Sequence, residues 1–391
     1  MAGLASSEAH VLAVYDASRR RITLEVRRGD RTQVVRRRKV NLPGALGFAF
    51  VVCENRVTAL VDEDGAWRPV VTARAKVSRL LDLRQPATLA GLRYAWGSRG
   101  SGATVSQVRA GLFGMTGLRD PHLVQHADVT PYLVDGMAYL TATFAGMGFF
   151  PQAHWGVFTL DLEDPQRLEQ TAQLYFARDG LVLGDHAGQV VRDGDRWIIA
   201  TSSWGDFRDA GVHVRHAETA EDVLNGVHVL PSEPTVLPTR VSCWDPSLTR
   251  IDGSWNVAFV ESPSQKPWDF HPALAVGAGS DWHEDLRLVG AATDLHQCEG
   301  PILAHVDDDW WVLASDGDAR CYPVFDRSMR RVGRLDAPYP TNIPHPQLVP
   351  LPGGGFLMVT FDGRQYAGKV LGYGGHGDIL VMRSTDRSRT G

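Results

Sequence analysis

Cysteine is scarce in this chain. Only four occur among 391 residues, and they are widely spaced, with no C-x-x-C pair. That spacing argues against a zinc site and against a disulfide framework. The first 13 residues also lack the basic segment followed by an apolar one that marks a signal peptide. We therefore expect a reduced, cytoplasmic protein in which Cys243 and Cys298 are buried thiols.

Long apolar runs and an excess of positive charge are missing as well. No run approaches the roughly 20 apolar residues that span a bilayer. The net charge of −5 gives no general attraction to nucleic acid. The first 40 residues do hold ten Lys or Arg against four acids. No aromatic residues are interleaved with them for base stacking, so we interpret these charges as the solvent faces and edges of strands.

Signals for helices are also few, at 162–174 and 217–224. Almost everything else is typical of short β runs bounded by Gly, Pro, Asp and Asn. Within residues 1–110 the pattern predicts several such runs and an antiparallel β-sandwich that serves as an accessory domain. These runs are 11–15, 21–26, 32–37, 47–52 and 56–61.

One phrase recurs five times in the rest of the chain: a short acidic or Gly turn, then an aromatic residue that opens a β run. The aromatic residues are 58, 58, 55 and 46 residues apart. That length fits a four-stranded propeller blade with long loops, and Asp-Gly supplies the positive φ angles of a tight hairpin turn. We therefore predict an all-β protein with a five-bladed β-propeller over 111–391. The copies are Asp135-Gly136 with Tyr139, Asp193-Gly194 with Trp197, Asp252-Gly253 with Trp255, Asp307-Asp308 with Trp310, and Gly353-Gly354 with Phe356.

An acidic residue or a histidine stands 7 to 15 residues before each of these turns. The innermost strand of every blade lines the channel of a propeller, so these side chains should converge on one cavity. Pro biases the residue before it toward extended backbone, which should aim the acids that precede it. We expect Arg119 to point away from Asp120, because neighbours along a strand face opposite sides. The candidates are Asp120, Asp185, His186, Asp245, Glu299 and His345.

Three of these motifs, Asp120-Pro121, Asp245-Pro246 and Glu299-Gly300-Pro301, resemble those of the five-bladed propeller glycosidases of glycoside hydrolase families 43 and 62. The resemblance covers roughly residues 115 to 385. It implies that Asp120 is the general base and Glu299 the general acid, and that Asp245 orients the acid and tunes its protonation. It also implies that His345 lies near the centre of the channel, where some members hold an ion. The N-terminal extension and the Asp185-His186 pair depart from the family pattern.

The resemblance implies a glycoside hydrolase of the inverting type that acts on a small glycoside or an oligosaccharide and requires no cofactor. An inverting site separates its two carboxyl groups by about 6.5–9.5 Å, which suits residues on different blades. Beyond the three acids, we expect substrate contacts from polar and aromatic residues near the motifs. These are Asp185, His186, Trp204, His271, His345 and Trp155.

Two other functions fit the same residues. An oxygen-rich ring with one histidine, His345, suits calcium or manganese. The chain is then an enzyme of another class, in specialised metabolism, or holds a structural calcium ion in the channel. The other alternative is a propeller that binds glycans without cleaving them. We expect no nucleic-acid or membrane partner.

Overall fold

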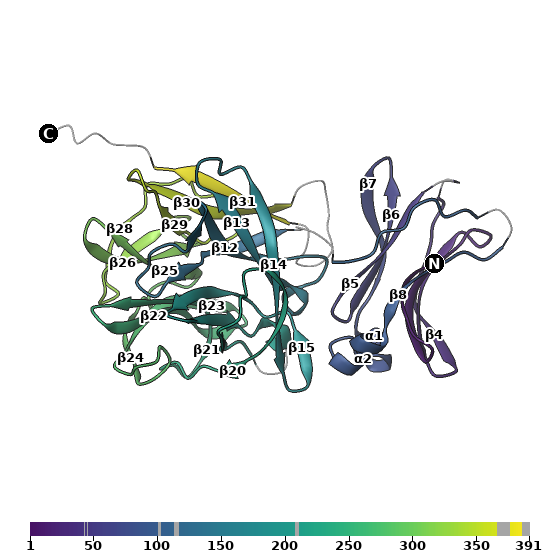
Figure 1. Cartoon of the computed structure of the whole chain (residues 1–391), viewed down its shortest axis with the longest axis horizontal. Coiled ribbons are helices and arrows are strands. Elements are labelled where there is room, and N and C mark those ends of the chain that lie inside the picture. Colours follow the sequence, from purple (N-terminus) through teal and green to yellow (C-terminus); the bar gives the residue numbers. More distant parts are fainter. Residues whose placement is uncertain are drawn as a thin grey trace.

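The computed structural model describes residues 1–391 except 43, 45, 101–102, 113–116, 208–210, 366–375 and 385–391. Strands dominate, so the all-β prediction is confirmed (Figure 1). The described helices are short: α1 (Ala75–Leu80), α2 (Pro86–Gly91) and the 3-10 turns η1 (Phe150–Gln152) and η2 (Trp204–Asp206). None of the helices in these ranges has the length and apolar character to span a bilayer. All four cysteines are buried and free, so the prediction of buried thiols at Cys243 and Cys298 is confirmed.

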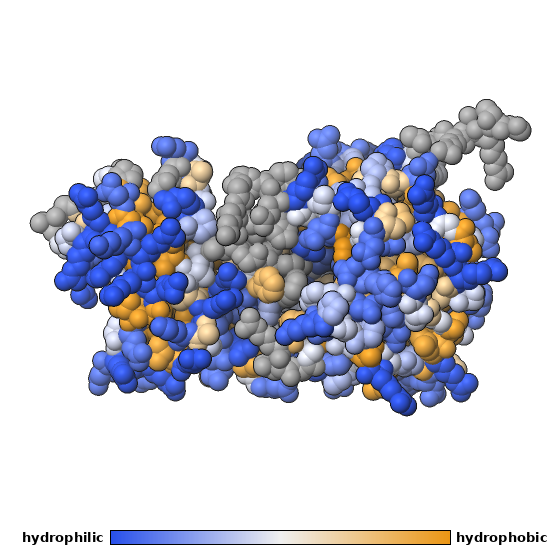
Figure 2. Space-filling model, turned by 180° about the vertical axis from the view of Figure 1, so that it is seen from behind, coloured by the Kyte–Doolittle hydropathy of each residue, from blue (hydrophilic) through white to orange (hydrophobic). Residues whose placement is uncertain are grey.

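Two antiparallel sheets form the N-terminal part of the chain. Apolar side chains alternate with polar ones along residues 21–26, and Val11 and Leu24 of one sheet join Val57 and Val61 of the other in one core. Five of the ten basic residues at the start of the chain lie exposed on the edge strand β4 (Arg31–Lys39): Arg31, Arg36, Arg37, Arg38 and Lys39. Figure 2 shows the hydrophilic surface at this end of the molecule. The first sheet runs in the order β4 (Arg31–Lys39), β3 (Arg21–Arg28), β2 (Ala9–Asp16), β1 (Ala2–Ala5), β8 (Arg93–Trp96); the second is β5 (Gly47–Cys53), β6 (Arg56–Glu63), β7 (Ala66–Ala73).

Five further sheets, numbered 1 to 5, follow one another along residues 118–383. Sheet 1 holds β9 (Leu118–Leu123), β11 (Leu133–Val134), β12 (Met137–Phe144), β13 (His154–Asp161), β14 (Leu168–Arg178), β15 (Leu181–Leu183) and β19 (Gly226–Pro231). Sheet 2 holds β10 (Gln125–His126), β16 (His186–Asp193), β17 (Arg196–Ser202), β18 (Val214–Thr219) and β20 (Glu233–Pro234). Sheet 3 holds β21 (Ser242–Ile251), β22 (Ser254–Gln265), β23 (Trp268–Gly277) and β24 (Leu286–Ala291). Sheet 4 holds β25 (Cys298–Val306), β26 (Asp309–Asp316), β27 (Pro323–Phe325) and β28 (Arg331–Arg334); sheet 5 holds β29 (Gln347–Pro350), β30 (Phe356–Gln365) and β31 (His376–Arg383).

Neighbouring sheets share apolar cores, and the last sheet packs back onto the first. Sheets 2 and 3 meet in one cluster of buried side chains, and sheets 3 and 4 in another. Ile302 of sheet 4 packs near Leu348 of sheet 5, and Val359 of sheet 5 joins the cluster of Leu140 in sheet 1. The five sheets therefore close a ring, and within it β9 contacts β16 and β29 while β21 contacts β16 and β25.

The predicted turns form hairpins in the structure. Asp135 and Gly136 have φ of +51° and +79°, and Asp252 and Gly253 have φ of +51° and +81°. Two successive residues with positive φ make the type I′ turn that Asp-Gly favours, since its twist matches that of the flanking strands. The local chemistry of these dipeptides was therefore enough to place the strand ends.

The two predicted helical segments are wrong. Residues 162–174 end inside β14, where Ala172, Leu174 and Phe176 are buried at every second position. Residues 217–224 begin at the end of β18 and continue into a turn. Burial against sheet 2 decides the first case, because tertiary packing overrides the weak helical propensity of a short segment.

Candidate active site

Four of the innermost strands bulge at the same point, and this bulge positions the candidate site. The residue there has a positive φ in each sheet: +49° at Asp120, +56° at Ala187, +50° at Asp245 and +64° at Gly300. The strand pairing shifts register beside each of them. A bulge of this kind inserts one extra residue and bends the strand. The expectation that Pro holds Asp120 and Asp245 extended is therefore wrong; both adopt the left-handed conformation, which Asp tolerates better than most residues.

The bulge also breaks the alternation of side chains. Nε of Arg119 lies 3.7 Å from Oδ1 of Asp120, and both side chains are buried. The prediction that Arg119 points away from Asp120 is therefore wrong, because the strand is not regular there. Arg119 also lies over the ring of Phe361, 4.9 Å from its centre.

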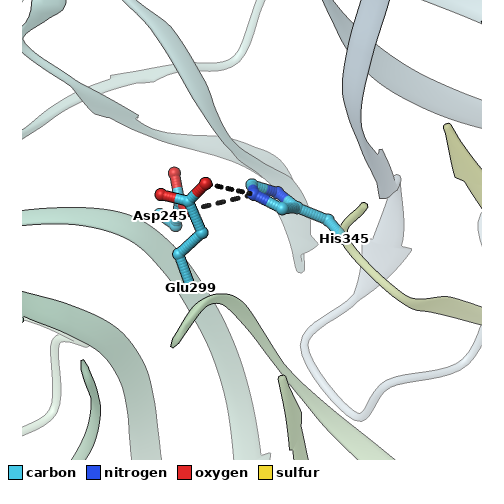
Figure 3. Close-up of side chains that lie close together, drawn as sticks. All are labelled: Asp245, Glu299 and His345. Carbon is cyan, nitrogen blue, oxygen red and sulfur yellow. Dashed lines mark ion pairs between the residues drawn. The ribbon is translucent and has the colours of Figure 1, made fainter. Parts of the chain in front are cut away.

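His345, which lies just before β29, is the meeting point of the three acids. Its Nε2 is 3.5 Å from Oδ2 of Asp245, 3.8 Å from Oδ1 of Asp120 and 3.8 Å from Oε1 of Glu299. Figure 3 shows Asp245 and Glu299 on one side of the imidazole. Side chains from sheets 1, 3 and 4 thus converge on one group.

Backbone and indole donors fix two of the acids. Oδ2 of Asp245 accepts the N–H of Gly300 at 3.1 Å, and the N–H of Asp245 itself donates to Oγ of Ser202 at 2.9 Å. Trp244 donates its indole N–H to Oε2 of Glu299 at 3.3 Å. Glu299 is the most open member of the group, with 17% of its side chain exposed against 7–8% for the other three.

The electrostatics of the cluster favour a charged histidine. Burial alone would lower the pKa of His345, but the negative charges of Asp245, Asp120 and Glu299 outweigh it and raise the pKa to about 9. Burial raises the pKa of Asp245 to about 8. The positive charge of His345 opposes this rise, and the negative charges of Glu299 and Asp120 add to it. Burial would raise the pKa of Asp120 too, yet the charges of His345, Arg119 and His186 hold it below its usual value. Near neutral pH, Asp120 is therefore ionised while Asp245 and His345 carry protons.

A small cavity lies among these side chains. Asp120, Asp245 and His345 line it together with His122 and Ile302. Its volume of about 10 Å³ has room for about one water molecule. Burial lowers the pKa of His122 to about 3, so this histidine is neutral.

Comparison with solved structures identifies the fold. No protein-family model matches the chain, and no curated protein matches its sequence. A GH43_1 enzyme from Xanthomonas citri, solved with xylotriose, superposes with a TM-score of 0.51 at 14% identity, over 70% of this chain and 89% of that one. This chain has the fold of the family 43 glycoside hydrolases. An α-L-arabinofuranosidase from Lactobacillus brevis (TM-score 0.48, 11% identity, 70% and 92% covered) and a levansucrase from B. megaterium (TM-score 0.48, 8% identity, 70% and 85% covered) are also similar.

Within this family 43 fold, two further predicted residues lie beside the cluster. His186 occupies the position before the bulge in sheet 2, which is where Glu299 stands in sheet 4. Its ring stacks on Trp204 with centres 6.1 Å apart, and its Nδ1 is 3.5 Å from Oγ1 of Thr143. His186 lies close enough to Asp120 for its charge to lower the pKa of that carboxyl, and Trp204 packs against Trp244 with ring centres 5.3 Å apart.

Three other predicted residues are not brought to the acid cluster. Asp185 is fully buried, forms an ion pair with Arg178 and accepts the N–H of Gly205 at 2.9 Å. Trp155 is fully buried between sheets 1 and 2. His271 lies 3.6 Å from Glu261 and lines a separate pocket.

The sequence reasoning missed two contacts of the acids, Arg119 and Trp244. The indole of Trp244, the residue before Asp245, reaches Glu299 of the next sheet. Arg119 had no signal, because a positive φ at Asp120 cannot be read from Asp-Pro.

Proposed function

We propose that this protein is a glycoside hydrolase. In this proposal the five sheets are the blades of a five-bladed propeller over 111–391, and residues 1–110 form a β-sandwich accessory domain. The observation that carries it is the convergence of three carboxyl groups, Asp120, Asp245 and Glu299, on His345. Glycoside cleavage needs one carboxyl group to protonate the leaving oxygen and another to activate water.

The surroundings of each acid support one role. Asp120 stays ionised because of its positive neighbours, which suits a general base. Glu299 is the most exposed acid, which suits a general acid that must reach the leaving oxygen. Asp245 binds the backbone N–H of Gly300, next to Glu299, so we assign it to positioning the acid.

The geometry is compatible with inversion. Oδ1 of Asp120 and Oε1 of Glu299 each lie 3.8 Å from the same imidazole nitrogen, so they are separated by no more than these two distances together. That limit allows the separation of about 6.5–9.5 Å found in inverting enzymes and also the roughly 5–5.5 Å of retaining ones, so the anomer released decides between them. The water-sized cavity at Asp120 provides room for the molecule that this base would activate.

The test begins with a substrate panel. We would assay p-nitrophenyl pentosides and hexosides together with xylo-oligosaccharides, since the similar X. citri enzyme was solved with xylotriose. Proton NMR would follow the first anomer released, and inversion is the expected outcome. Glu299→Gln should abolish cleavage while the fold persists, whereas Glu284→Gln, at an exposed acid, should not. Full activity of Glu299→Gln on a substrate with a poor leaving group would overturn the assignment.

A metal-dependent enzyme is the second candidate. Asp245, Glu299 and His345 offer ligand atoms that all lie within 4.8 Å of one another. Imidazole with carboxylates suits a transition metal better than calcium. His345 would have to lose its proton to bind, so affinity for Mn²⁺ should rise between pH 6 and pH 9. Calorimetry with Mn²⁺ at these two pH values separates the two candidates: no binding at either pH removes the metal function.

A further inference from the structure

A second pocket lies at the same end of sheet 3 as Asp245. Glu261 pairs with Cys243, which stands two residues before Asp245, and Glu261 also pairs with His271 on β23. The pocket has a volume of about 390 Å³, within the range of about 300–1,000 Å³ typical of small-molecule sites. Its lining residues are Thr239, Arg240, Val241, Glu261, Pro263, Asp269, His271 and Thr293.

A largely buried pair of polar side chains forms one wall. Nε2 of His271 is 3.6 Å from Oε2 of Glu261, and the two side chains are 8% and 14% exposed. Hydrogen bonding from His271 is the main cause that lowers the pKa of Glu261, with Thr239 adding to it. Glu261 is therefore an ionised acceptor with lone pairs to spare, since a carboxylate has about four acceptor positions.

The mixture of groups in this lining indicates the class of ligand. Arg240 donates, Glu261 and Asp269 accept, and the hydroxyl of Thr293 can do both. Two carboxylates disfavour an anionic ligand, and polar groups set beside Val241 and Pro263 suit a ligand that carries hydroxyl groups on an apolar frame. A neutral, polyhydroxylated molecule that donates and accepts along the same wall fits this set.

The pocket lies behind the wall that holds the candidate acid. Successive side chains of β23 face opposite sides. On one side, Trp268 and Phe270 pack against Trp244, with ring centres 6.2 Å and 5.5 Å away, and Trp244 binds Glu299. Asp269 and His271 face the pocket on the other side. One strand therefore separates the pocket from the acid cluster.

We propose that this pocket is a second carbohydrate-binding site, which holds a sugar unit of an oligosaccharide other than the unit that is cleaved. The inference rests on the proposed glycosidase function for its biological meaning, and it goes further by assigning longer, neutral oligosaccharides as the preferred substrates. The pocket adds hydrogen bonds only to substrates that extend beyond the cleaved bond.

The first test compares the activity of Glu261→Gln and Arg240→Ala on short and long substrates. For both variants, kcat/KM on an aryl monoglycoside should match the wild type, while KM for oligosaccharides of three or more units should rise about tenfold, as expected for a lost hydrogen bond to a charged group. Arg240 is exposed, so its replacement cannot unfold the protein even where Glu261→Gln does. Glu233→Gln, at an exposed acid on β20, is the control. If activity falls equally on substrates of every length, or falls on none of them, the proposal is overturned.

The second test does not depend on catalysis. Saturation-transfer NMR would measure binding of xylotriose, cellotriose and maltotriose to Glu299→Gln and to Glu299→Gln combined with Glu261→Gln. We expect the second protein to bind its best trisaccharide at least tenfold more weakly. If the two proteins bind equally well, or if neither binds any of the three trisaccharides, the proposed second binding site is overturned. If the wild type hydrolyses no substrate of the panel while Glu261→Gln still weakens trisaccharide binding, only the proposed glycosidase activity is overturned.

Discussion

The imidazole of His345 lies directly against Gly300. A Cβ atom at residue 300 would fall 2.3 Å from Cγ of His345, well inside van der Waals contact, and φ at this residue is +64°. The same Gly300 donates its N–H to Asp245. Glycine at this position therefore sets how closely the histidine approaches the three acids.

Gly300→Ala should lower kcat/KM by about a hundredfold with little change in overall fold. The added methyl group must push the imidazole away, and a displacement of about 1 Å in an active site costs on the order of 10² in rate. Steady-state kinetics on the best glycoside, with circular dichroism to check the fold, measures this. Gly353→Ala is the control, since nothing lies within 4 Å of a Cβ there. Wild-type kinetics in Gly300→Ala would mean that the His345 position does not matter.

His345→Asn should move the acid limb of the kcat/KM profile to higher pH. The positive charge of His345 is one of the groups that lower the pKa of Asp120 against burial. Without it, Asp120 keeps its proton to a higher pH, so the base becomes active only at a higher pH than in the wild type. A pH–rate profile from pH 3 to pH 9 measures the shift.

His122→Asn is the matched control for that profile. His122 lines the same cavity, but burial lowers its pKa to about 3, so it is neutral over most of the range from pH 3 to pH 9. Its replacement by another neutral group should leave the limb in place. If both variants shift the limb equally, the cause is a change of shape, and the charge of His345 is not responsible.

Trp244→Phe should reduce kcat about tenfold or more while the fold persists. The phenyl ring keeps the packing against Phe270 and Trp268 but cannot donate to Glu299. A hydrogen bond to a charged group is worth about 1.5–3 kcal/mol, and about 1.4 kcal/mol corresponds to tenfold. Trp282→Phe, at another fully buried indole, should show wild-type kcat. An equal drop in both variants would show that the effect comes from packing alone.

The sequence predicted the turns and the set of acids better than the details of their placement. Asp-Gly turns have a local chemistry that decides their backbone, so the strand ends and the spacing of the sheets could be read directly. Counting back from each turn then placed Asp120, Asp245, Glu299 and His345 at one end of the ring, where the structure has them.

The same counting put Asp185 in the set, although its side chain turns to Arg178. His186 immediately precedes the bulged residue of sheet 2, as Glu299 precedes that of sheet 4. Asp185 stands two residues before the bulged residue. A shift of one residue exchanges the two faces of a strand. Bulges add one residue without altering the hydrophobic pattern, so neither this offset nor the contact of Arg119 with Asp120 could be predicted.

Glu54→Gln should make the stability of the protein less dependent on pH. Glu54, in the turn between β5 and β6, accepts the N–H of Gly184 at 3.3 Å and so joins the N-terminal part to the ring. Burial raises its pKa from 4.5 to about 8. Since the folded state holds this proton more tightly than the unfolded one, its contribution to stability is full below about pH 4.5 and is lost as pH rises through about 8.

Thermal unfolding from pH 5 to pH 9 at constant ionic strength should therefore show Glu54→Gln several degrees more stable than the wild type at pH 9 and similar to it at pH 5. Glu163→Gln, at an exposed acid, should follow the wild type throughout. A Glu54→Gln curve that also follows the wild type would mean that Glu54 is solvated in the folded protein and that this junction is open to water.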